Sequence, residues 1–499
     1  MSDKLFKDEH LANMPTIRIA KIGLKNFKSV KSGEITFNCG RKFIPYGTES
    51  DITGIYGQNG SGKTSMIYAI GLLKYLLSGE SIPDAFAECI SIDSDCAVIV
   101  YTLDIQYPNR DSYESNNDIR KVVYTVTFGR ELREKKQEIN LFADKEFNDY
   151  FVPKIKFRPV VIDESIKISG TVKGRKTPLK PYIDTSGELV DICPKTKLNL
   201  LVGSLDEDKR VALGINKNKA YSEAKSFVFL SDMMSLYYKN SDYSYLYQML
   251  FELQHWGKFN LFFIDSNSYS FSTLNAIFFL YLDGNPVPIP ASNSFELPTE
   301  DLKECAKVVN SIGGVVQEVI PGLQVKLKDY GITSNVNGKD MHSAELIVVR
   351  DGNEMPFRYE SDGIKKLIST LYFIIELYTD DSVTVAYDEF DSGVFEYLLG
   401  EILQILRSSG KGQLIFTSHN LYPLTVLGNE CIYFTTTDPY DRFIKLTGIG
   451  GTNNLRTVYL REIGHPDRYD NLYNETKRNR IISAMRKADS DLWEDQEEK

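Results

Sequence analysis

The segment that most constrains the fold of this chain is an octet at residues 57–64, which reads GQNGSGKT. It matches the pattern G-x-x-x-x-G-K-[ST], in which glycines let backbone N–H groups curl around a phosphate. Lys63 supplies a positive charge for the β- and γ-phosphates, and Thr64 supplies a hydroxyl for Mg²⁺. The predicted nucleotide contacts are the whole loop and the residue after it, namely Gly57, Gln58, Asn59, Gly60, Ser61, Gly62, Lys63, Thr64 and Ser65.

The flanks of the octet have the patterns of a strand and a helix. Residues 52–56 form a short apolar run, and residues 65–73 are apolar at helical spacing. The first N–H groups of a helix have no partner within the helix, so its N-terminus attracts anions. The sequence therefore predicts a strand, a phosphate-binding loop and a helix, in that order.

Composition adds a few limits. The chain has 499 residues, of which 42% are hydrophobic, so we expect well-filled cores and two lobes or domains. No apolar run approaches the roughly 18 residues of a membrane span, and the charged N-terminus has no apolar signal core. The six cysteines form no C-x-x-C pair. We therefore expect a cytoplasmic protein with no membrane contact, zinc site or disulfide framework.

The charge distribution leaves nucleic-acid binding open. A net charge of −10 argues against a nucleic-acid coat protein, but a local basic patch remains compatible with it. Three runs are candidates: residues 130–136, 167–180 and 477–487. Most charge runs are solvated faces. Residues 489–499 are acidic, and we expect them to fray.

A second chemical cluster lies at residues 383–389, which read VTVAYDE. The β-branched run predicts a strand buried in a parallel sheet, and ligands bind at the carboxyl ends of such strands. Asp388 is placed to hold Mg²⁺, and Glu389 to direct the water that attacks the γ-phosphate. Two exposed turn acids are the alternative. The octet at residues 57–64 favours the catalytic interpretation.

A third cluster repeats this pattern at residues 414–420, LIFTSHN. An apolar strand ends near His419, whose ring could hydrogen-bond the γ-phosphate; a purely structural histidine is the alternative. Residues 394–407 predict a helix between the two strands, which makes a strand–helix–strand unit. That context favours a functional His419.

A fourth element opens the long apolar helix predicted over residues 362–379. Ser361 and Gly363 stand at its start, either as another anion site or as a plain N-cap. Lys63 and Asp388 are 388 − 63 = 325 positions apart. A large insert therefore separates the two phosphate motifs.

The rest of the chain predicts a framework of strands and helices. Residues 150–225 carry clusters of Pro, Gly and Lys and predict irregular structure. The other predicted elements are a β-hairpin over 16–37, strands at 96–105, 122–128, 323–328 and 344–349, and helices over 222–256 and 300–320.

The order of these motifs resembles the ABC-type ATPases of the RecF, structural-maintenance-of-chromosomes and overcoming-lysogenization-defect (AAA15-like) group. The resemblance covers residues 16–80 and 300–460 and implies an α/β P-loop NTPase fold of the ABC-ATPase head type. That fold has a mixed sheet lobe, a parallel core sheet flanked by helices, and here a helical insertion. The segments that carry the resemblance are NFKS at 26–29, GQNGSGKT, ESDGIKK at 360–366, YDEFDSG at 387–393 and TSHN at 417–420.

The resemblance also implies a domain division. We expect an N-terminal lobe of the head over 1–150 and an insertion, irregular and then helical, over 151–299. A C-terminal lobe with the signature, the Walker B acids and the switch histidine would span 300–465. A basic helix and an acidic tail would fill 466–499.

The same resemblance implies ATP and Mg²⁺ as cofactors and hydrolysis of ATP to ADP and phosphate between two heads. Ser361 and Gly363 look like the signature that reaches the partner's nucleotide, Asp391 like the dimer-contact loop, and His419 like the switch histidine. The signature departs from the usual L-S-G-G-Q/E, since Asp362 brings a negative charge toward a phosphate. The glutamine of the family's first lobe has no identifiable counterpart.

Two features narrow the subfamily. The chain has no long heptad arms, which disfavours a chromosome-condensing or Rad50-type protein. Only 499 − 419 = 80 residues follow His419, too few for a Toprim nuclease domain. Residues 453–460, NNLRTVYL, are similar to a segment of ATPases from two-gene anti-phage systems (PARIS, Septu and abortive infection). This implies a sensor or scaffold that forms a head-to-head dimer or larger homo-oligomer and controls a separate nuclease or toxin. The alternative is a RecF-like DNA-repair ATPase that binds duplex DNA.

Overall fold

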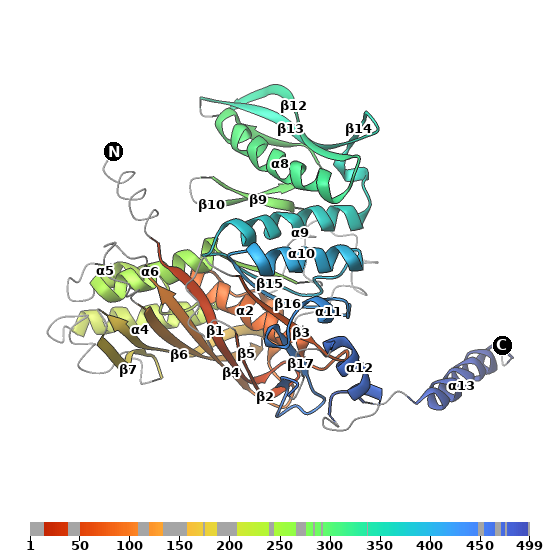
Figure 1. Cartoon of the computed structure of the whole chain (residues 1–499). Coiled ribbons are helices and arrows are strands. Elements are labelled where there is room, and N and C mark those ends of the chain that lie inside the picture. The colour runs from red at the N-terminus through yellow and green to blue at the C-terminus, as the bar shows by residue number, and fades with distance from the viewer. Residues whose placement is uncertain are drawn as a thin grey trace.

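The strands of one six-stranded sheet lead into the predicted phosphate loop, the predicted acids and His419 (Figure 1). Its pairs are parallel except the edge pair β17–β18. The strand order is β18(Phe443–Ile444), β17(Ile432–Thr435), β3(Asp51–Tyr56), β16(Gln413–Thr417), β15(Thr384–Tyr387), β8(Leu261–Ile264). This computed structural model describes residues 14–37, 50–107, 119–132, 157–172, 175–186, 207–238, 244–265, 276–282, 285–290, 293–336, 338–447, 454–464, 471–474 and 477–497.

Both faces of this core sheet are buried, each against a different hydrophobic core. Ile55 and Ile415 pack into the core that contains α2(Lys63–Ser78) and the antiparallel sheet. Their strand neighbours Tyr56 and Phe416 pack into the core that contains α9(Asp362–Thr379) and α10(Glu396–Ser409). Successive side chains of a strand point to opposite faces. A strand buried on both faces therefore reads as a continuous apolar run, as predicted for residues 383–387.

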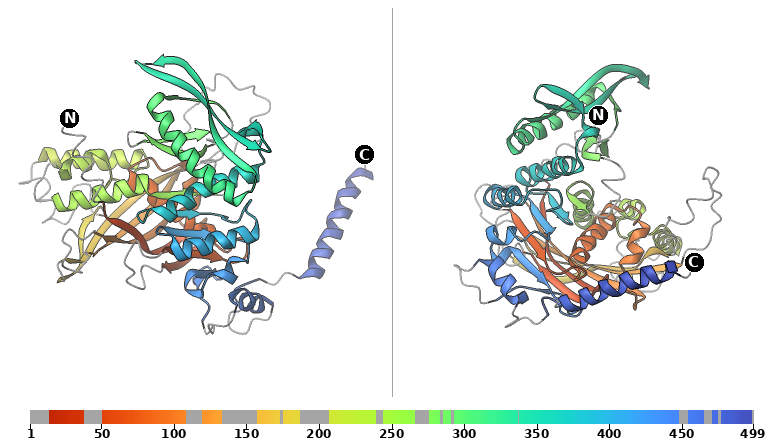
Figure 2. Two further views of the ribbon diagram at one scale, coloured as in Figure 1. Left: turned by 45° about the horizontal axis from the view of Figure 1, so that its top comes forward. Right: turned by 90° about the vertical axis from the view of Figure 1, so that its right-hand side faces the viewer.

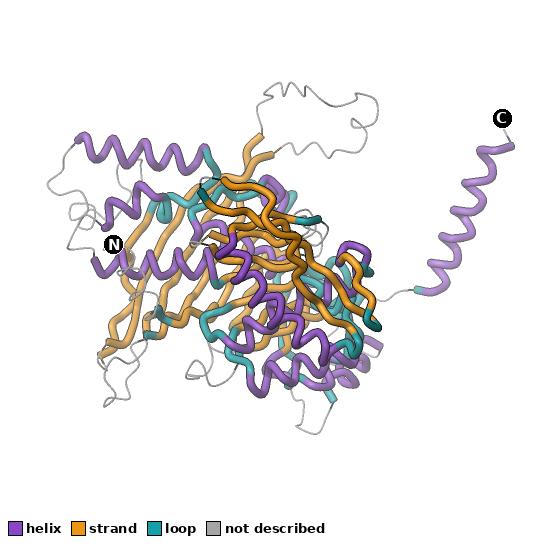
Figure 3. The backbone as a smooth tube through the Cα atoms, turned by 90° about the horizontal axis from the view of Figure 1, so that it is seen from above, coloured by secondary structure: helices purple, strands orange, loops and turns teal. Residues whose placement is uncertain are grey.

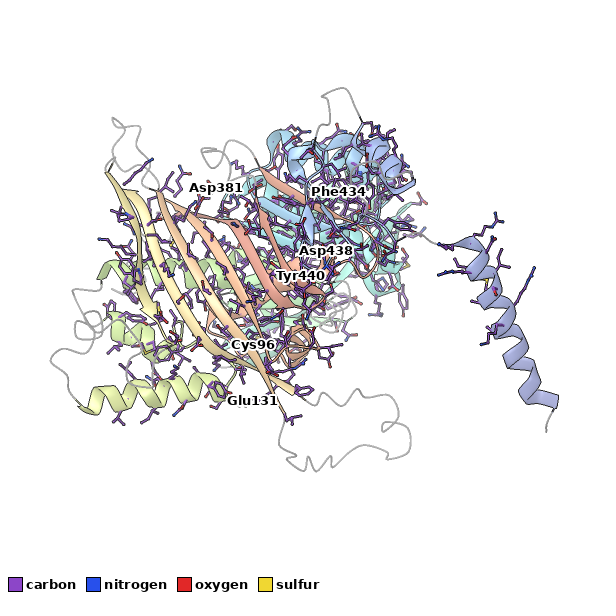
Figure 4. The ribbon with its side chains drawn as sticks, turned by 90° about the horizontal axis from the view of Figure 1, so that it is seen from below. Cys96, Glu131, Asp381, Phe434, Asp438 and Tyr440 are labelled. Carbon is purple, nitrogen blue, oxygen red and sulfur yellow. The ribbon has the colours of Figure 1, made fainter. Side chains whose placement is uncertain are left out.

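A second six-stranded sheet, antiparallel throughout, forms the N-terminal lobe. The predicted hairpin and the strands at 96–105 and 122–128 are confirmed. Figure 4 shows this sheet from below, with Cys96 and Glu131 at the same end of neighbouring strands. The order is β2(Val30–Thr36), β1(Thr16–Phe27), β4(Cys96–Gln106), β5(Ile119–Leu132), β6(Phe157–Val172), β7(Arg175–Asp184).

The predicted irregular structure over residues 150–225 is wrong where the structure describes that segment. Strands β6 and β7 extend the antiparallel sheet there, and α4(Glu207–Ser222) follows. Pro178 and Pro181 argue against a central strand, but β7 lies at the sheet edge, where proline is tolerated. Because β6 and β7 lie beyond residue 150, the expected lobe boundary cuts this sheet.

The segment between β8 and β15 adds a separate layer on the α9 side of the core sheet (Figures 1 and 2). Its helix α8(Thr299–Val319) covers an antiparallel sheet of order β11(Phe295–Pro298), β13(Lys339–Arg350), β12(Leu323–Val336), with β14(Asn353–Pro356) also paired to β13. A hairpin of β9(Ala276–Leu282) and β10(Asn285–Pro290) precedes this sheet. The helices predicted over 300–320 and 362–379 are confirmed.

The remaining helices lie at the two ends of the molecule. α6(Ser244–Phe259) packs beside α2, and α5(Ser231–Tyr238) packs against α6. α11(Pro423–Val426) and α12(Leu455–Gly464) lie near β17. The last helix, α13(Arg478–Glu497), stands away from the body (Figure 3). Among the described helices, none combines the length and the apolar character needed to cross a bilayer. Short 3-10 turns occur at Asp84–Cys89, Phe357–Tyr359 and Asn429–Cys431.

Candidate nucleotide-binding site

The predicted phosphate loop joins β3 to α2, and its lysine holds it in shape. Lys63 Nζ donates hydrogen bonds to the carbonyl oxygens of Gly57 at 2.7 Å and Gln58 at 3.1 Å. Burial lowers the pKa of Lys63, and the carboxylate of Asp388 is the first of several that oppose this effect. The ammonium group thus sits among acceptors that a phosphate could replace.

The glycines of the loop fulfil distinct steric requirements. A Cβ on Gly57 would lie 1.8 Å from Thr435 Oγ1, and the φ of Gly57 is 154°. Gly62 has φ 92° and caps α2 without any side-chain hydrogen bond, and the first turn of α2 has no acidic residue. The loop therefore comes close to β17 and presents an unscreened positive helix end. Ser61 closes the turn by donating to the Gln58 carbonyl at 2.6 Å.

The predicted acids meet the loop at the carboxyl end of β15. Thr64 Oγ1 lies 3.2 Å from Asp388 Oδ1, and Thr417 Oγ1 donates to the same oxygen at 2.5 Å. The backbone N–H of Glu389 donates to Thr417 Oγ1 at 2.8 Å. Asp388 is 2% exposed, and burial raises its pKa. Thr417 therefore ties both acids to the end of β16.

Glu389 adopts a backbone conformation that most residues avoid. Its φ is 53°, in the left-handed region. A non-glycine residue there costs about 1–2 kcal/mol, and such strain gathers at functional sites. The turn that follows keeps Glu389 half-buried at the sheet edge, because its carbonyl accepts from Ser392 N at 3.0 Å.

Asp391 links the turn that follows β15 and carries Asp388 and Glu389, here called the acid turn, to the loop that carries His419. The Asp391 carboxylate accepts hydrogen bonds from the backbone N–H groups of His419 at 3.2 Å and Asn420 at 2.9 Å. A cavity of about 390 Å³ lies beside this junction. It is lined by Tyr56, Gly57, Gln58, Asn59, Ser418, His419, Leu421, Tyr459, Ile463 and Tyr473.

Ser361 and Gly363 lie at the N-terminus of α9, and within one chain Ser361 acts as a plain N-cap. Its Oγ accepts from Ile364 N at 3.3 Å. A Cβ on Gly363 would meet the Gly393 carbonyl at 3.9 Å, so the two glycines pack closely. The side chain of Asp362 is fully exposed and pairs with Lys365 at 3.7 Å. The structure thus groups these residues with the acid turn rather than with the phosphate loop.

The structure adds a further carboxylate that the sequence interpretation missed. Asp265 follows β8, which pairs with β15, and it is 6% exposed. The Tyr68 hydroxyl, one turn beyond Thr64 on α2, donates to Asp265, and Asp265 raises the pKa of Asp388. The signal was present: an apolar run, LFFI, ends in an acid, as at residues 383–388.

Two further positions were missed because they act through the backbone or through packing. Thr435 Oγ1 lies against the loop and donates to the Tyr56 carbonyl at 3.2 Å. Asn474 N donates to Gln58 Oε1 at 3.0 Å, which lays residues 471–474 over the loop. No local sequence pattern marks either contact, because each depends on where distant segments meet.

The oxygen atoms around Asp388 fit Mg²⁺. Mg²⁺ in nucleotide sites uses one or two carboxylates, hydroxyls, water and phosphate oxygens. Asp388 and Thr64 supply one carboxylate and one hydroxyl, and the burial that raises the Asp388 pKa would be offset by a cation. In the described part of the chain, no group of three or more His, Cys, Asp or Glu forms an all-protein metal site.

Comparisons with known proteins locate the same region. The family model described as an AAA domain matches residues 21–234, a span that contains the phosphate loop but ends before Asp388. A search of curated proteins found no match. The matched span therefore includes β3, the predicted phosphate loop and α2.

Three solved structures are similar to this chain at low identity. An SMC head domain from Pyrococcus furiosus bound to the C-terminal domain of ScpA has 13% identity and a TM-score of 0.36, covering 86% of this chain and 96% of that one. The recombination mediator RecF with ATP has 15% identity and a TM-score of 0.36, covering 87% and 100%. An SMC head domain from Thermotoga maritima has 13% identity and a TM-score of 0.32, covering 86% and 100%.

Proposed function

We propose that this chain binds Mg-ATP and hydrolyses it to ADP and phosphate. One observation carries the proposal: the glycine loop and the buried carboxylate of Asp388 meet through the 3.2 Å contact to Thr64, across 324 positions of sequence. A glycine loop alone is an anion site. A loop joined to a buried carboxylate and a hydroxyl is a site for a metal-bound polyphosphate.

Each residue of the site would have a separate role in binding or hydrolysis, set by its charge and its position. Lys63 would exchange its two carbonyl acceptors for phosphate oxygens, and the N–H groups at the start of α2 would face the same anion. Bound Mg²⁺ would neutralise the β- and γ-phosphate charge. Glu389 would orient and deprotonate the attacking water, and His419 would contact the γ-phosphate.

Two variants test this assignment. Lys63→Ala should lower ATP affinity on the order of 100-fold, because a desolvated charge contact to phosphate is lost. Glu389→Gln should keep ATP affinity and slow hydrolysis by a factor on the order of 10² to 10⁴. Calorimetric binding and phosphate release are the measurements, and the exposed Lys307→Ala is the matched control. Parental hydrolysis by Glu389→Gln would refute the role of Glu389.

We infer further that two copies close over nucleotide. Ser361, Asp362 and Gly363 are exposed at the start of α9, where a helix N-terminus is free to meet phosphate from a second copy. Glu389→Gln with ATP should therefore sediment as a dimer, and Ser361→Arg should prevent this without changing ATP binding to the single chain. If mass is independent of ATP in Glu389→Gln, the two-copy arrangement is wrong.

The output of this switch is proposed to lie in another protein. The resemblance of residues 453–460 to anti-phage ATPases supports a sensor or scaffold that controls a nuclease or toxin. Co-purification with the product of the neighbouring gene, with and without ATP, tests this. If no complex forms either with or without ATP, the proposed control of a partner protein is wrong.

A RecF-like role on duplex DNA is the second candidate, and a basic surface favours it. Lys167, Lys176 and Lys180 are exposed on β6 and β7, at the free edge of the antiparallel sheet. Binding through phosphates loses affinity steeply with salt. Steep salt dependence together with DNA-stimulated hydrolysis would favour DNA repair. Replacing these three lysines by glutamine should abolish both effects if the surface binds DNA.

A further inference from the structure

Helix α13 presents apolar side chains to solvent with no covering element among the described residues. Ile481, Ile482 and Met485 expose 42%, 37% and 67% of their surfaces. The helix has 20 residues and stands off the body (Figures 2 and 3). In proteins most of the stability of a helix comes from packing of its apolar face against another element. Its exposed apolar residues therefore indicate a helix that is stabilised by a partner.

The spacing of apolar positions in α13 is that of a two-helix seam. Residues 481, 485, 488 and 492 are Ile, Met, Ala and Leu, at intervals of four, three and four. Alternating intervals of three and four place positions on one face and are the signature of paired helices. The partner that fits this face is another helix with the same spacing.

The charge distribution along α13 indicates which helix would pair with it and whether the two helices would run parallel or antiparallel. Residues 477–487 contain five basic residues and no acid, whereas residues 489–499 contain six acids and one lysine. Two such helices in parallel would set like charges side by side, but antiparallel helices set each basic half against an acidic half. With position 481 opposite 492, Arg478 falls opposite Asp495.

We propose that α13 pairs antiparallel with the α13 of a second copy of this chain and so joins two copies through their C-terminal ends. A nucleic acid would be attracted by residues 477–487 but repelled by residues 489–499, which favours a second copy. The pairing uses no nucleotide. It therefore stands or falls separately from the proposed ATPase function.

A charge-swap experiment on the full-length protein tests the pairing without nucleotide. One variant carries Lys477→Glu, Arg478→Glu and Arg480→Glu, and the other carries Asp491→Lys, Glu494→Lys and Asp495→Lys. Sedimentation should show parental dimers, monomers for each variant alone, and dimers again when the two variants are mixed. Dimers of either variant alone, or a mixture that stays monomeric, would overturn the proposal.

Cross-linking fixes the direction of the helices and detects weak pairing. Chains with Ile481→Cys should form disulfide dimers with chains carrying Leu492→Cys, because these positions face each other when the helices are antiparallel. Ile481→Cys alone should not cross-link, because antiparallel pairing separates its two copies by about 16 Å of helix axis. Self-cross-linking of Ile481→Cys, or none in the mixture, would contradict the proposal. The parental chain under the same oxidant is the control.

Binding of a duplex DNA probe tests whether residues 477–487 bind nucleic acid instead of a second α13. If the Lys477→Glu, Arg478→Glu, Arg480→Glu variant loses DNA binding but keeps its parental mass, the basic half serves nucleic acid and the pairing is wrong. If its mass halves while DNA binding is unchanged, the pairing is supported.

Discussion

Thr64 Oγ1 lies 3.2 Å from Asp388 Oδ1, although 324 positions of sequence separate the two residues. Thr64 lies in the first turn of α2, and Asp388 directly follows β15, so this contact joins the predicted phosphate loop to the turn that carries the two acids. Because β3 and β15 both flank β16 in one parallel sheet, their carboxyl ends meet at one edge. The two predicted nucleotide motifs thus lie together at one end of the sheet.

Two glycines of the loop should differ sharply in their tolerance of a methyl group. Gly57→Ala places Cβ 1.8 Å from Thr435 Oγ1, so the loop must shift and ATP affinity should fall at least 10-fold. Gly60→Ala meets nothing within 4 Å but has φ 77°, so it should cost about 1 kcal/mol of stability. Calorimetric ATP binding and thermal unfolding measure both effects. Equal ATP affinities in the two variants would contradict the steric account.

The strained turn at Glu389 predicts a trade of stability against activity. Asn tolerates φ near 53° better than Glu does. Glu389→Asn should therefore raise the melting temperature by about 1–2 °C and also abolish hydrolysis. Glu389→Gln is the matched control, because it should slow hydrolysis without raising the melting temperature. A lower melting temperature for Glu389→Asn would mean that the side chain stabilises the turn.

Asp265, which follows the strand paired with β15, should strengthen Mg²⁺ binding at Asp388. Asp265→Asn should raise the Mg²⁺ concentration needed for half-maximal ATP binding by about 10-fold, as expected for a residue beside a metal ligand. Tyr68→Phe removes the hydroxyl that donates to Asp265 and should give a smaller shift in the same direction. A Mg²⁺ titration of fluorescent nucleotide binding measures this. Unchanged Mg²⁺ dependence in Asp265→Asn would assign the residue to packing alone.

Glu376 should make stability depend on pH. Burial first, and then Asp380, raise the pKa of Glu376 from 4.5 to about 7. Because the folded protein keeps a proton that the unfolded chain releases, this group's contribution to stability falls as pH rises from about 4.5 to 7. Glu376→Gln should therefore gain about 1 kcal/mol at pH 8 and nothing at pH 4.5, after allowance for partial exposure.

Thermal unfolding between pH 4.5 and 8 measures this difference, with exposed Glu318→Gln as the control. If the stabilisation by Glu376→Gln is the same at both ends of the range, the carboxyl group is not the cause.

Local sequence patterns were enough to predict those strands and helices that are buried and adjoin a motif. Residues 383–387 and 362–379 were predicted from their apolar runs, because burial on both faces or on one helical face leaves a direct trace in the sequence. The same reasoning failed at β6 and β7. There, Pro178 and Pro181 are tolerated by the edge position of β7, and this position is a property of the sheet order rather than of the local sequence.

The sequence by itself determined the phosphate loop, because only glycines and a lysine at fixed spacing let the backbone wrap an anion. It also determined which strands would end in Asp388 and His419. Only the tertiary structure decided that Asp265 and Thr417 lie beside Asp388 and that Asn474 contacts the loop. Their places depend on strand order and on chain segments that meet across hundreds of residues, and long-range packing of this kind leaves no periodic signal at any one of them.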